Sequence, residues 1–504
     1  MISVRQKQRG VPWINDDYLT LARQRDYYRK QFGKTKLMFW WNKFQYIRNR
    51  ANNLNKILKK KYYQDKFQDC GNDIKKNWNV LSKLIPKKNK NMNHDIKLTI
   101  GSDQIPSEEI AHVLNKAFNE VGSRLQTPSG NSSEDLLNNL QTLFIPACKF
   151  EFCAIKKEYV VKELLHIDCS KAVGVDGIHP KLLKLAAVYI AGPLTHLFNA
   201  TLQTCIIPKD FKTARITPIH KGGSFDIDNF RPISVLPALS KILERAIHDQ
   251  LYTYLNVNKL LANCQSGFRP SYSTATCLTE ITDYLCDKRD QKHVIGGIFL
   301  DLRKAFDVIP HNFILAKLKF YGIKGKEYDW LESYLTDRRQ FVTVNNCSSE
   351  CLKIKSGVPQ GSILGPLIFC LFINDMCNVN LHFNSKMSLY ADDTAIFNHG
   401  ETMKEVQKNL QDDFVTICKW LDLNNMHLHP RKTKVMAFGN KKKLRNDVLS
   451  IKFRNLPLEN VKKIKYLGVM LDSGLTWSEH VSTIVRKISR AIGCIRRIKH
   501  LLSF

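Results

Sequence analysis

The sequence of 504 residues lacks any run of eighteen apolar residues, the length that a membrane-spanning helix needs. Its first residues, MISVRQKQRGVPWIN, contain no apolar stretch of the length found in signal peptides. None of the 14 cysteines forms a CxxC pair, and the closest two, Cys347 and Cys351, have no second pair of metal-ligand type nearby. We therefore expect an intracellular protein whose cysteines are free thiols in a reducing compartment.

Acidic residues are fewer than basic residues, and the difference varies along the chain. The chain has 77 Lys and Arg against 46 Asp and Glu, a net charge of +31. Residues 1–100 hold 24 basic and 7 acidic residues, and residues 441–504 hold 15 and 4, so the excess lies at the two ends. This distribution favours a polyanionic partner that contacts both ends of a nearly neutral body, although basic residues also serve solubility.

The basic N-terminal region, residues 1–100, has a helical pattern. A helix is predicted to begin after Asn15, with two acids in its first turn. Aromatic and basic residues then alternate at three- and four-residue spacing, which suits nucleic-acid backbones and stacked bases. The same pattern suits a simple helical hairpin packed by Trp40, Trp41 and Tyr46, so both interpretations stay open.

The composition and the hydrophobic pattern of the sequence change twice after this region. Residues 101–154 carry less charge and include TPSGNSSED, so we expect a linker there. From residue 155 onward, helical stretches alternate with short β-rich runs such as VIGGIFL and QFVTVNN. This alternation indicates an α+β or α/β body.

An acid follows the β-rich run VIGGIFL at Asp301, and a helix-like segment then continues until Pro310. Alone, an acid at the end of a strand is as well explained by a helix cap or an ion pair. The stretch SLYADDTAIF supplies two more acids, Asp392 and Asp393, at what should be the tip of a tight hairpin.

If the strand that ends at Asp301 lies beside this hairpin, three carboxylates converge. Like charges in a half-buried place raise one another's pKa and need compensation. Hard oxygen ligands with few His or Cys neighbours select Mg²⁺ or Mn²⁺, and two such ions can clamp the attacking and leaving oxygens of a phosphoryl transfer. The pattern therefore predicts a two-metal phosphoryl-transfer site.

Two other stretches could serve that chemistry. In SGVPQGSILGPLIF, glycines recur every fourth residue, and a turn at Gln360 and Gly361 should point the Gln360 amide outward, towards a base or sugar. Lys221 and Arg231 flank a Gly-Gly turn, where a β-hairpin would bring both onto one face for a triphosphate. A plain turn before a buried helix, and two solvated loop bases, remain the alternatives.

The order of the motifs KAVGVDGIHP, RITPIHKGG, NFRPISVL, NCQSGFRPSYST, FLDLRKAFD, GVPQGSILGPLIF, YADD, HPRKTKVMAF and IKYLGVMLD resembles the reverse transcriptases of non-long-terminal-repeat (LINE-type) retrotransposons, with the jockey and chicken-repeat-like branches most similar. The resemblance covers about residues 155–480. It implies an α+β right-hand polymerase with fingers, palm and a helical thumb. The N-terminal region resembles the segment that joins endonuclease to polymerase in these elements.

The resemblance also implies residue roles. Asp301 and Asp392 would bind metal, with Asp393 as partner and Leu302 lending its main-chain carbonyl. Phe306 would be an aromatic gate against a ribose 2′-OH, or else a packed core residue. The remaining roles would be contact with template and nucleotide at Gln360 and Gly361, triphosphate binding at Lys221 and Arg231, proton donation by Lys432 or its competitor Lys434, and a primer grip at Tyr466, Leu467 and Gly468.

The function implied is an RNA-directed DNA polymerase that uses two Mg²⁺ or Mn²⁺ ions, an RNA template, a DNA primer and deoxynucleoside triphosphates. The alternatives are a silent RNA-binding remnant and an enzyme of the same chemistry that copies DNA or adds untemplated nucleotides. We expect residues 1–100 to be a basic extension, 101–154 a linker, 155–475 fingers and palm, and 476–504 the start of a truncated thumb, in a fragment without the endonuclease. The family's need to reach chromosomal DNA implies a nuclear location.

The charge of the first hundred residues adds one hypothesis, that these helices hold the element's own RNA. An unchanged RNA affinity after deletion of residues 1–100 would count against it.

Overall fold

The protein is described here from a computed structural model, which covers residues 11–84, 96–100, 103–125, 148–439 and 449–501. Contacts divide the chain into two compact units, one of residues 1–94 with 478–504 and one of residues 95–477. The predicted thumb segment thus groups with the N-terminal region from Ser478 onward, and the short helix after α17 contacts α2. Within the described ranges, no helix combines the length and apolarity that crossing a membrane requires.

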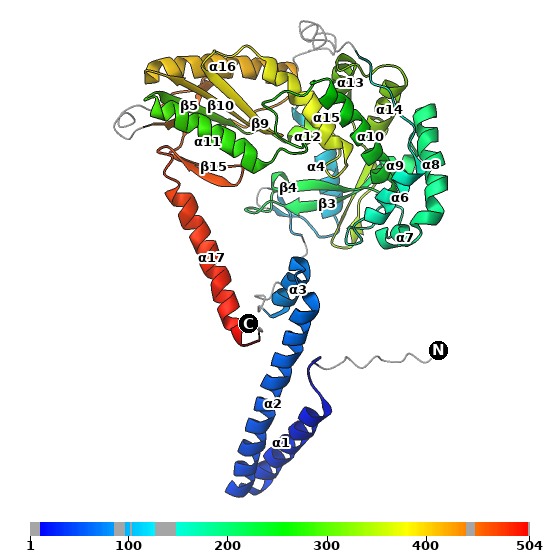
Figure 1. The fold of residues 1–504 in the computed structure, drawn as a ribbon, viewed down its shortest axis with the longest axis vertical. Helices are drawn as coiled ribbons and strands as arrows, with labels where there is room; N and C mark the ends of the chain where they lie inside the picture. Colours follow the sequence, from blue (N-terminus) through cyan, green and yellow to red (C-terminus); the bar gives the residue numbers. More distant parts are fainter. Residues whose placement is uncertain (1–10, 85–95, 101–102, 126–147, 440–448, 502–504) are drawn as a thin grey trace. The chain divides into compact units, whose positions relative to one another are not determined.

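The first unit is helical, and its main feature is a hairpin of two long helices (Figure 1). Asn15 begins the first helix as predicted, since its side chain accepts a hydrogen bond from the Tyr18 amide. Trp41 lies 4.9 Å from Phe32 across the hairpin, whereas Tyr46 is 62% exposed and does not pack it. The unit consists of α1 (Asp16–Thr35), α2 (Met38–Cys70), α3 (Ile74–Leu84), α17 (Ser478–Ile498) and η3 (Lys499–Leu501).

The second unit is a mixed α/β body, which confirms an α+β fold class. Helix α7 begins with Pro180 at its first position, where a missing N–H costs nothing. The helices of this unit are α4 (Ile110–Leu125), α6 (Lys157–His166), α7 (Pro180–Leu185), α8 (Ala187–Thr204), α9 (Lys209–Lys212), η1 (Ile227–Asn229), α10 (Ala238–Val257), α11 (Thr274–Asp290), α12 (Ala305–Val308), α13 (His311–Phe320), α14 (Lys326–Leu335), α15 (Leu364–Ile373), η2 (Asn374–Asn378) and α16 (Met403–Leu423).

The strands of the second unit build two larger sheets and three small pairs. They are β1 (Thr99–Ile100), β2 (Asp103–Gln104), β3 (Thr213–His220), β4 (Phe230–Val235), β5 (Val294–Leu300), β6 (Arg339–Val344), β7 (Cys347–Ser348), β8 (Leu352–Lys353), β9 (Ser385–Tyr390), β10 (Asp393–Gly400), β11 (Lys434–Phe438), β12 (Lys452–Phe453), β13 (Leu456–Pro457), β14 (Glu459–Asn460), β15 (Lys463–Tyr466) and β16 (Val469–Asp472).

The central sheet has the strand order β14-β11-β5-β10-β9, and β5 is antiparallel to both of its neighbours. Helix α16 covers one face and α11 the other (Figure 1). Successive residues of β5 point to opposite faces, so Ile298 packs in the cluster of α16 and Phe299 in that of α11. Covering both faces explains why the sequence of β5 is continuously apolar rather than alternating.

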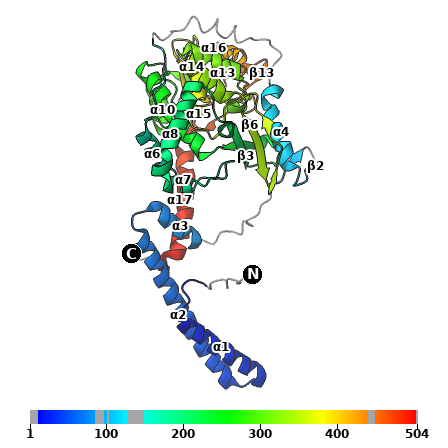
Figure 2. The same cartoon turned by 90° about the vertical axis from the view of Figure 1, so that its right-hand side faces the viewer.

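The second sheet, in the order β4-β3-β6-β7, carries α4 on one face (Figure 2). Leu98, Phe118 and Ile216 belong to one buried cluster there. The prediction of a linker over residues 101–154 is therefore wrong for the described part of that range, because an apolar helix face is buried against the sheet. The run TPSGNSSED lies outside the described residues.

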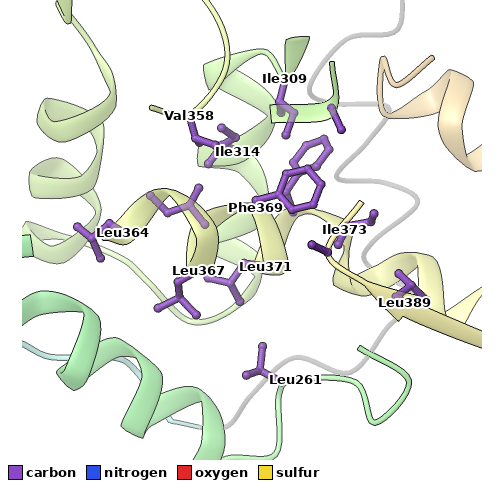
Figure 3. Packing of buried hydrophobic residues seen from close by; sticks show 14 of the residues in the cluster. Leu261, Ile309, Ile314, Val358, Leu364, Leu367, Phe369, Leu371, Ile373 and Leu389 are labelled. Atoms are coloured by element: carbon purple, nitrogen blue, oxygen red, sulfur yellow. The ribbon is translucent and has the colours of Figure 1, made fainter. Parts of the chain in front are cut away.

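Helix α15 runs through the centre of the larger core and is buried along its whole length, as its sequence predicts. Figure 3 shows Phe369 of this helix packed among Ile309, Ile314 and Ile373. This helix directly follows the loop that carries the candidate site residues Gln360 and Gly361.

The prediction that all cysteines are free is wrong for one pair. Cys264 and Cys377 are joined by a disulfide, with their Cα atoms 6.7 Å apart. The two residues are 113 positions apart in the chain, and only the fold brings the segment after α10 beside η2. The other twelve cysteines are free.

Candidate active site

Three chain segments meet at one edge of the central sheet. Strand β5 ends at Leu300 where β10 and β11 begin, because both neighbours run antiparallel to it. Thr394 pairs with Leu300, which places Asp393 and Asp301 at neighbouring positions just beyond the pairing. Asp301, Asp392 and Asp393 together are called the carboxylate edge below.

The predicted hairpin around the two adjacent acids is confirmed. Tyr390 pairs with Asp393, so Ala391 and Asp392 form a two-residue turn between β9 and β10. Ala391 has a φ of 57°, the left-handed conformation that the first position of such turns requires and that residues other than glycine rarely adopt. The turn therefore needs support from outside itself.

The carboxylates of this edge interact electrostatically. The pKa of Asp392 is raised, first by burial and also by the charge of Asp301. The pKa of Asp393 is raised to about 6 by burial of its carboxyl and then by the charges of Asp392 and Asp301. An ionised edge is thus under repulsive strain that a cation between the oxygens would relieve.

The backbone offers one further oxygen at this edge. Leu302 forms an isolated bridge with Leu428, but the bridging hydrogen bonds are made by the flanking residues, Arg303 N–H to His427 O and His429 N–H to Asp301 O. The Leu302 carbonyl is not used in this bridge. These oxygen donors suit a hard divalent cation, although in the described residues no three Asp, Glu, His or Cys side chains gather in a group that could hold a metal ion. The roles of Asp301, Leu302, Asp392 and Asp393 in metal binding stay predictions.

The two candidate proton donors differ in their partners. The Lys434 Nζ forms an ion pair with Glu459 and donates to the Arg431 carbonyl at 2.8 Å. Lys432 is exposed, lies two residues ahead of β11 and is close enough to Lys221 to lower that residue's pKa. The Lys434 ammonium group is thus engaged with neighbouring residues, and which of the two lysines donates a proton stays a prediction.

The second sheet contributes the two predicted phosphate-binding bases. Ile219 pairs with Arg231 in the β3–β4 hairpin, and the Lys221 amide donates to the Asn229 carbonyl at 2.8 Å. Positions 219, 221, 229 and 231 therefore share one face, which confirms the predicted geometry. Burial, and then the charges of Arg231 and Lys304, lower the pKa of Lys221, and triphosphate binding by Lys221 and Arg231 stays a prediction.

The half-buried acid Asp307 lies among these cations. The Gln360 side-chain amide donates to Asp307 Oδ1 at 2.7 Å, and the Gln360 carbonyl accepts from the Ser234 amide at 2.7 Å. The prediction that the Gln360 amide points outward is wrong for this structure, because the Asp307 carboxyl takes its donor. The sequence spacing alone did not indicate that Asp307 is the hydrogen-bond partner of Gln360.

The glycines of the same loop approach the protein's own backbone. A Cβ on Gly361, where φ is 124°, would lie 2.4 Å from the Ser234 carbonyl oxygen. A Cβ on Gly357 would lie 2.7 Å from the Phe306 carbonyl oxygen. Both glycines thus let the loop pack closely against the backbone of β4 and α12, while contact of Gly361 with template or nucleotide stays a prediction.

Burial raises the pKa of Asp307 to about 6 from the ordinary 3.8, an effect that the Gln360 hydrogen bond partly offsets. The folded chain therefore holds this proton more tightly than the unfolded chain, and its stability falls as pH rises from 4 to 7. Relative to Asp307→Asn, which keeps the acceptor oxygen, the wild type should lose up to about 3 kcal/mol across this range. Urea denaturation of both proteins at several pH values measures the difference, and parallel curves would contradict it.

Phe306 lies in α12, five residues after Asp301 in the sequence. Its ring is half-buried and stacks on Phe369 with 4.1 Å between ring centres, while Phe268 meets it edge-on at 6.0 Å. Two aromatic contacts thus hold the ring against the core, and the residue stays partly exposed. Both the gate and the packing interpretation are compatible with this position.

The predicted hairpin at Tyr466, Leu467 and Gly468 is present. Tyr466 pairs with Val469, and the turn residues Leu467 and Gly468 have φ values of 44° and 90°. The Tyr466 ring is buried against Phe299, 5.2 Å away, which fixes the hairpin to the α11 face of β5.

Comparison with known proteins agrees with this geometry. The sequence profile described as reverse transcriptase (RNA-dependent DNA polymerase) matches residues 219–471, half of the chain. The protein belongs to the reverse transcriptase family. Divalent-metal dependence is general in this family, and the matched range contains the whole carboxylate edge.

Curated reverse transcriptases of transposons are similar over most of the chain. The probable RNA-directed DNA polymerase of transposon BS from Drosophila melanogaster is 31% identical over 360 residues, 69% of this chain and 38% of that protein. The corresponding protein of the X-element is 30% identical over 70% of this chain and 38% of its own length. The RNA-directed DNA polymerase of the mobile element jockey is 29% identical over 72% and 43%. The chain thus spans about two fifths of these relatives.

Some residues of this reverse transcriptase site escaped sequence reasoning. Asp307, Thr433 and Gln265 are far apart in sequence, and each acts through one hydrogen bond to a site segment. Thr433 is fully buried, and its hydroxyl accepts from the Asp301 amide at 3.2 Å. The only sequence signal was that each stands in a motif characteristic of reverse transcriptases.

Proposed function

We propose that the chain is the polymerase part of a non-long-terminal-repeat retrotransposon protein and extends a DNA primer on an RNA template. The observation that carries this proposal is the carboxylate edge, which joins Asp301 to the hairpin turn at Asp392 in a chain of the reverse transcriptase family. In a right-hand polymerase, the central sheet would be the palm, the β3–β4 sheet and its helices the fingers, and α17 the first thumb helix.

Asp301 and Asp392, with the Leu302 carbonyl and Asp393 beside them, would hold the cations. The chemistry supplied by two bound Mg²⁺ or Mn²⁺ ions is activation of the primer 3′-OH for attack on an α-phosphate and neutralisation of the pyrophosphate leaving group. The raised pKa values of Asp392 and Asp393 support this role, because desolvated carboxylates that repel each other bind cations with relief of strain.

The remaining residues would position the deoxynucleotide. Lys221 and Arg231 on one face of the fingers hairpin would bind the triphosphate, with Arg231 able to make paired contacts. Phe306 would exclude a ribose 2′-OH. Gln360 and Gly361 would hold the loop that faces template and nucleotide, and Tyr466, Leu467 and Gly468 would grip the primer.

Lys432 would donate the proton that the pyrophosphate leaving group needs. We expect Lys432→Ala to lower kcat roughly a hundredfold, the size of a lost general acid. Lys434→Ala is the matched control, because its ion pair with Glu459 is a partly exposed contact worth less than about 1 kcal/mol. Pre-steady-state incorporation rates distinguish the two, and a larger loss for Lys434→Ala would reverse the assignment.

Primer extension by the purified chain tests the proposed function. Oligo(dT) on poly(rA), and the same primer on a DNA template, are supplied with Mg²⁺ or Mn²⁺ and thymidine triphosphate. Extension on the RNA template is the expected result. Extension on DNA alone would identify a DNA-copying enzyme. Salt-sensitive RNA binding without incorporation in either metal would indicate an RNA-binding protein instead.

A further inference from the structure

The segment Cys264–Gly267 lies beside the hairpin that carries Asp392. The Ser266 amide donates to the Leu389 carbonyl and the Leu389 amide donates to the Cys264 carbonyl, each at 2.8 Å. Gln265 and Leu389 thereby form a parallel bridge at the outer edge of β9. The segment acts as a short additional strand at the point where β9 leads into the turn.

The Gln265 side chain reaches from this segment into the turn itself. It is completely buried, and its Oε1 accepts hydrogen bonds from the Gly267 amide at 2.7 Å and the Ala391 amide at 3.1 Å. Ala391 immediately precedes Asp392. One side-chain oxygen thus ties the backbone on one side of Asp392 to a second, independent segment.

Gly267 also supports the turn, because its backbone contacts that of Ala391. A Cβ at this position would lie 2.2 Å from the Ala391 nitrogen, so the two backbones touch. The Gly267 carbonyl in turn accepts a hydrogen bond from the Cys370 thiol of helix α15 at 3.2 Å. The turn is therefore anchored, through Gln265 and Gly267, to the central helix of the core.

These contacts offset the free-energy cost of the backbone conformation in the turn. Ala391 has positive φ, which costs an alanine about 1–2 kcal/mol relative to its usual conformations. The hydrogen bond from the Ala391 amide to Gln265 offsets part of this cost and fixes the backbone next to Asp392. Sub-ångström placement of a ligand controls metal affinity, and groups that hold ligands in place matter nearly as much as the ligands.

We propose that Gln265 is the positioning residue for Asp392, holding the carboxylate where it and Asp301 can share a divalent cation. The inference rests on the proposed function only for the identity of the reaction. It predicts a change in metal affinity, which can be measured on the full chain without any nucleotide incorporation.

The test compares Gln265→Leu with Gln250→Leu by Mn²⁺ titration followed by electron paramagnetic resonance. Gln250 is a matched control, because its side-chain amide also bonds a distant backbone, that of Cys153, at 2.8 and 3.0 Å. We expect Gln265→Leu to weaken Mn²⁺ binding roughly tenfold and to raise the Mg²⁺ concentration for half-maximal primer extension similarly. Gln250→Leu should lower only thermal stability.

Equal Mn²⁺ affinities for the two leucine variants would overturn the proposal. If Gln265→Leu does not fold, Gln265→Met keeps the length of the side chain and also removes the acceptor oxygen, and a Mn²⁺ affinity equal to that of Gln250→Leu would refute the inference. A wild type that binds Mn²⁺ in a Gln265-dependent way but incorporates nothing would reject the proposed function and keep this inference.

Discussion

Asp392→Asn is expected to reduce nucleotide incorporation at least about a thousandfold, because the amide is neutral and a poor ligand for hard cations. Loss of several kcal/mol of transition-state stabilisation corresponds to this factor. The side chain keeps its size, and RNA affinity should stay unchanged. Single-nucleotide primer extension and filter binding measure the two quantities separately.

The same substitution should leave stability intact or raise it. The pKa of Asp392 is raised, so the ionised carboxylate costs the folded chain free energy that asparagine would not.

Asp337→Asn is the matched control, since Asp337 is an exposed acid of the same unit paired with Lys353 at 2.5 Å. The control should keep full activity. Residual incorporation within tenfold of wild type in Asp392→Asn would mean that the cations bind elsewhere.

Phe306→Val is expected to reduce discrimination against ribonucleotides roughly a hundredfold, the scale on which a pocket separates ligands that differ by a small group. The ring stacks on Phe369 at 4.1 Å, so it cannot retreat from a 2′-OH. A smaller side chain leaves room for that hydroxyl. Ratios of kcat/KM for the ribo- and deoxynucleotide measure the change.

A packing role would give a different result. Phe320→Val is the control, because Phe320 is also a half-buried ring packed against the same core cluster, in α13. Both variants should lose comparable stability in thermal denaturation. If Phe306→Val shares this loss and discriminates as the wild type does, the gate interpretation is wrong and the ring is only part of the core.

The hairpin and the edge strand were predictable because their signals are local. A β-rich run that ends at Asp301, and two short runs around Asp392, each describe one element and one turn. The shared face of Lys221 and Arg231 follows from hairpin geometry in the same way. Such inferences need only neighbouring residues.

The rest could not be predicted because it depends on contacts between distant segments. Gln360 faces inward only because Asp307 lies beside it, and Gly361 packs on Ser234, which belongs to another motif. A glycine pattern indicates that another group approaches the backbone closely, but it does not identify that group. Likewise, Gln265 gains its role only through the fold, which brings it within 3.1 Å of the Ala391 amide.

The strand order of the central sheet has a consequence for synthesis of the chain. Strand β5 is complete at Leu300, but the partner on its far side, β11, starts only at Lys434. At typical elongation rates, the ribosome needs on the order of ten seconds to bridge that interval. Throughout it, an uncharged strand that is apolar on both faces waits without its full set of neighbours, the condition under which nascent chains aggregate or recruit chaperones.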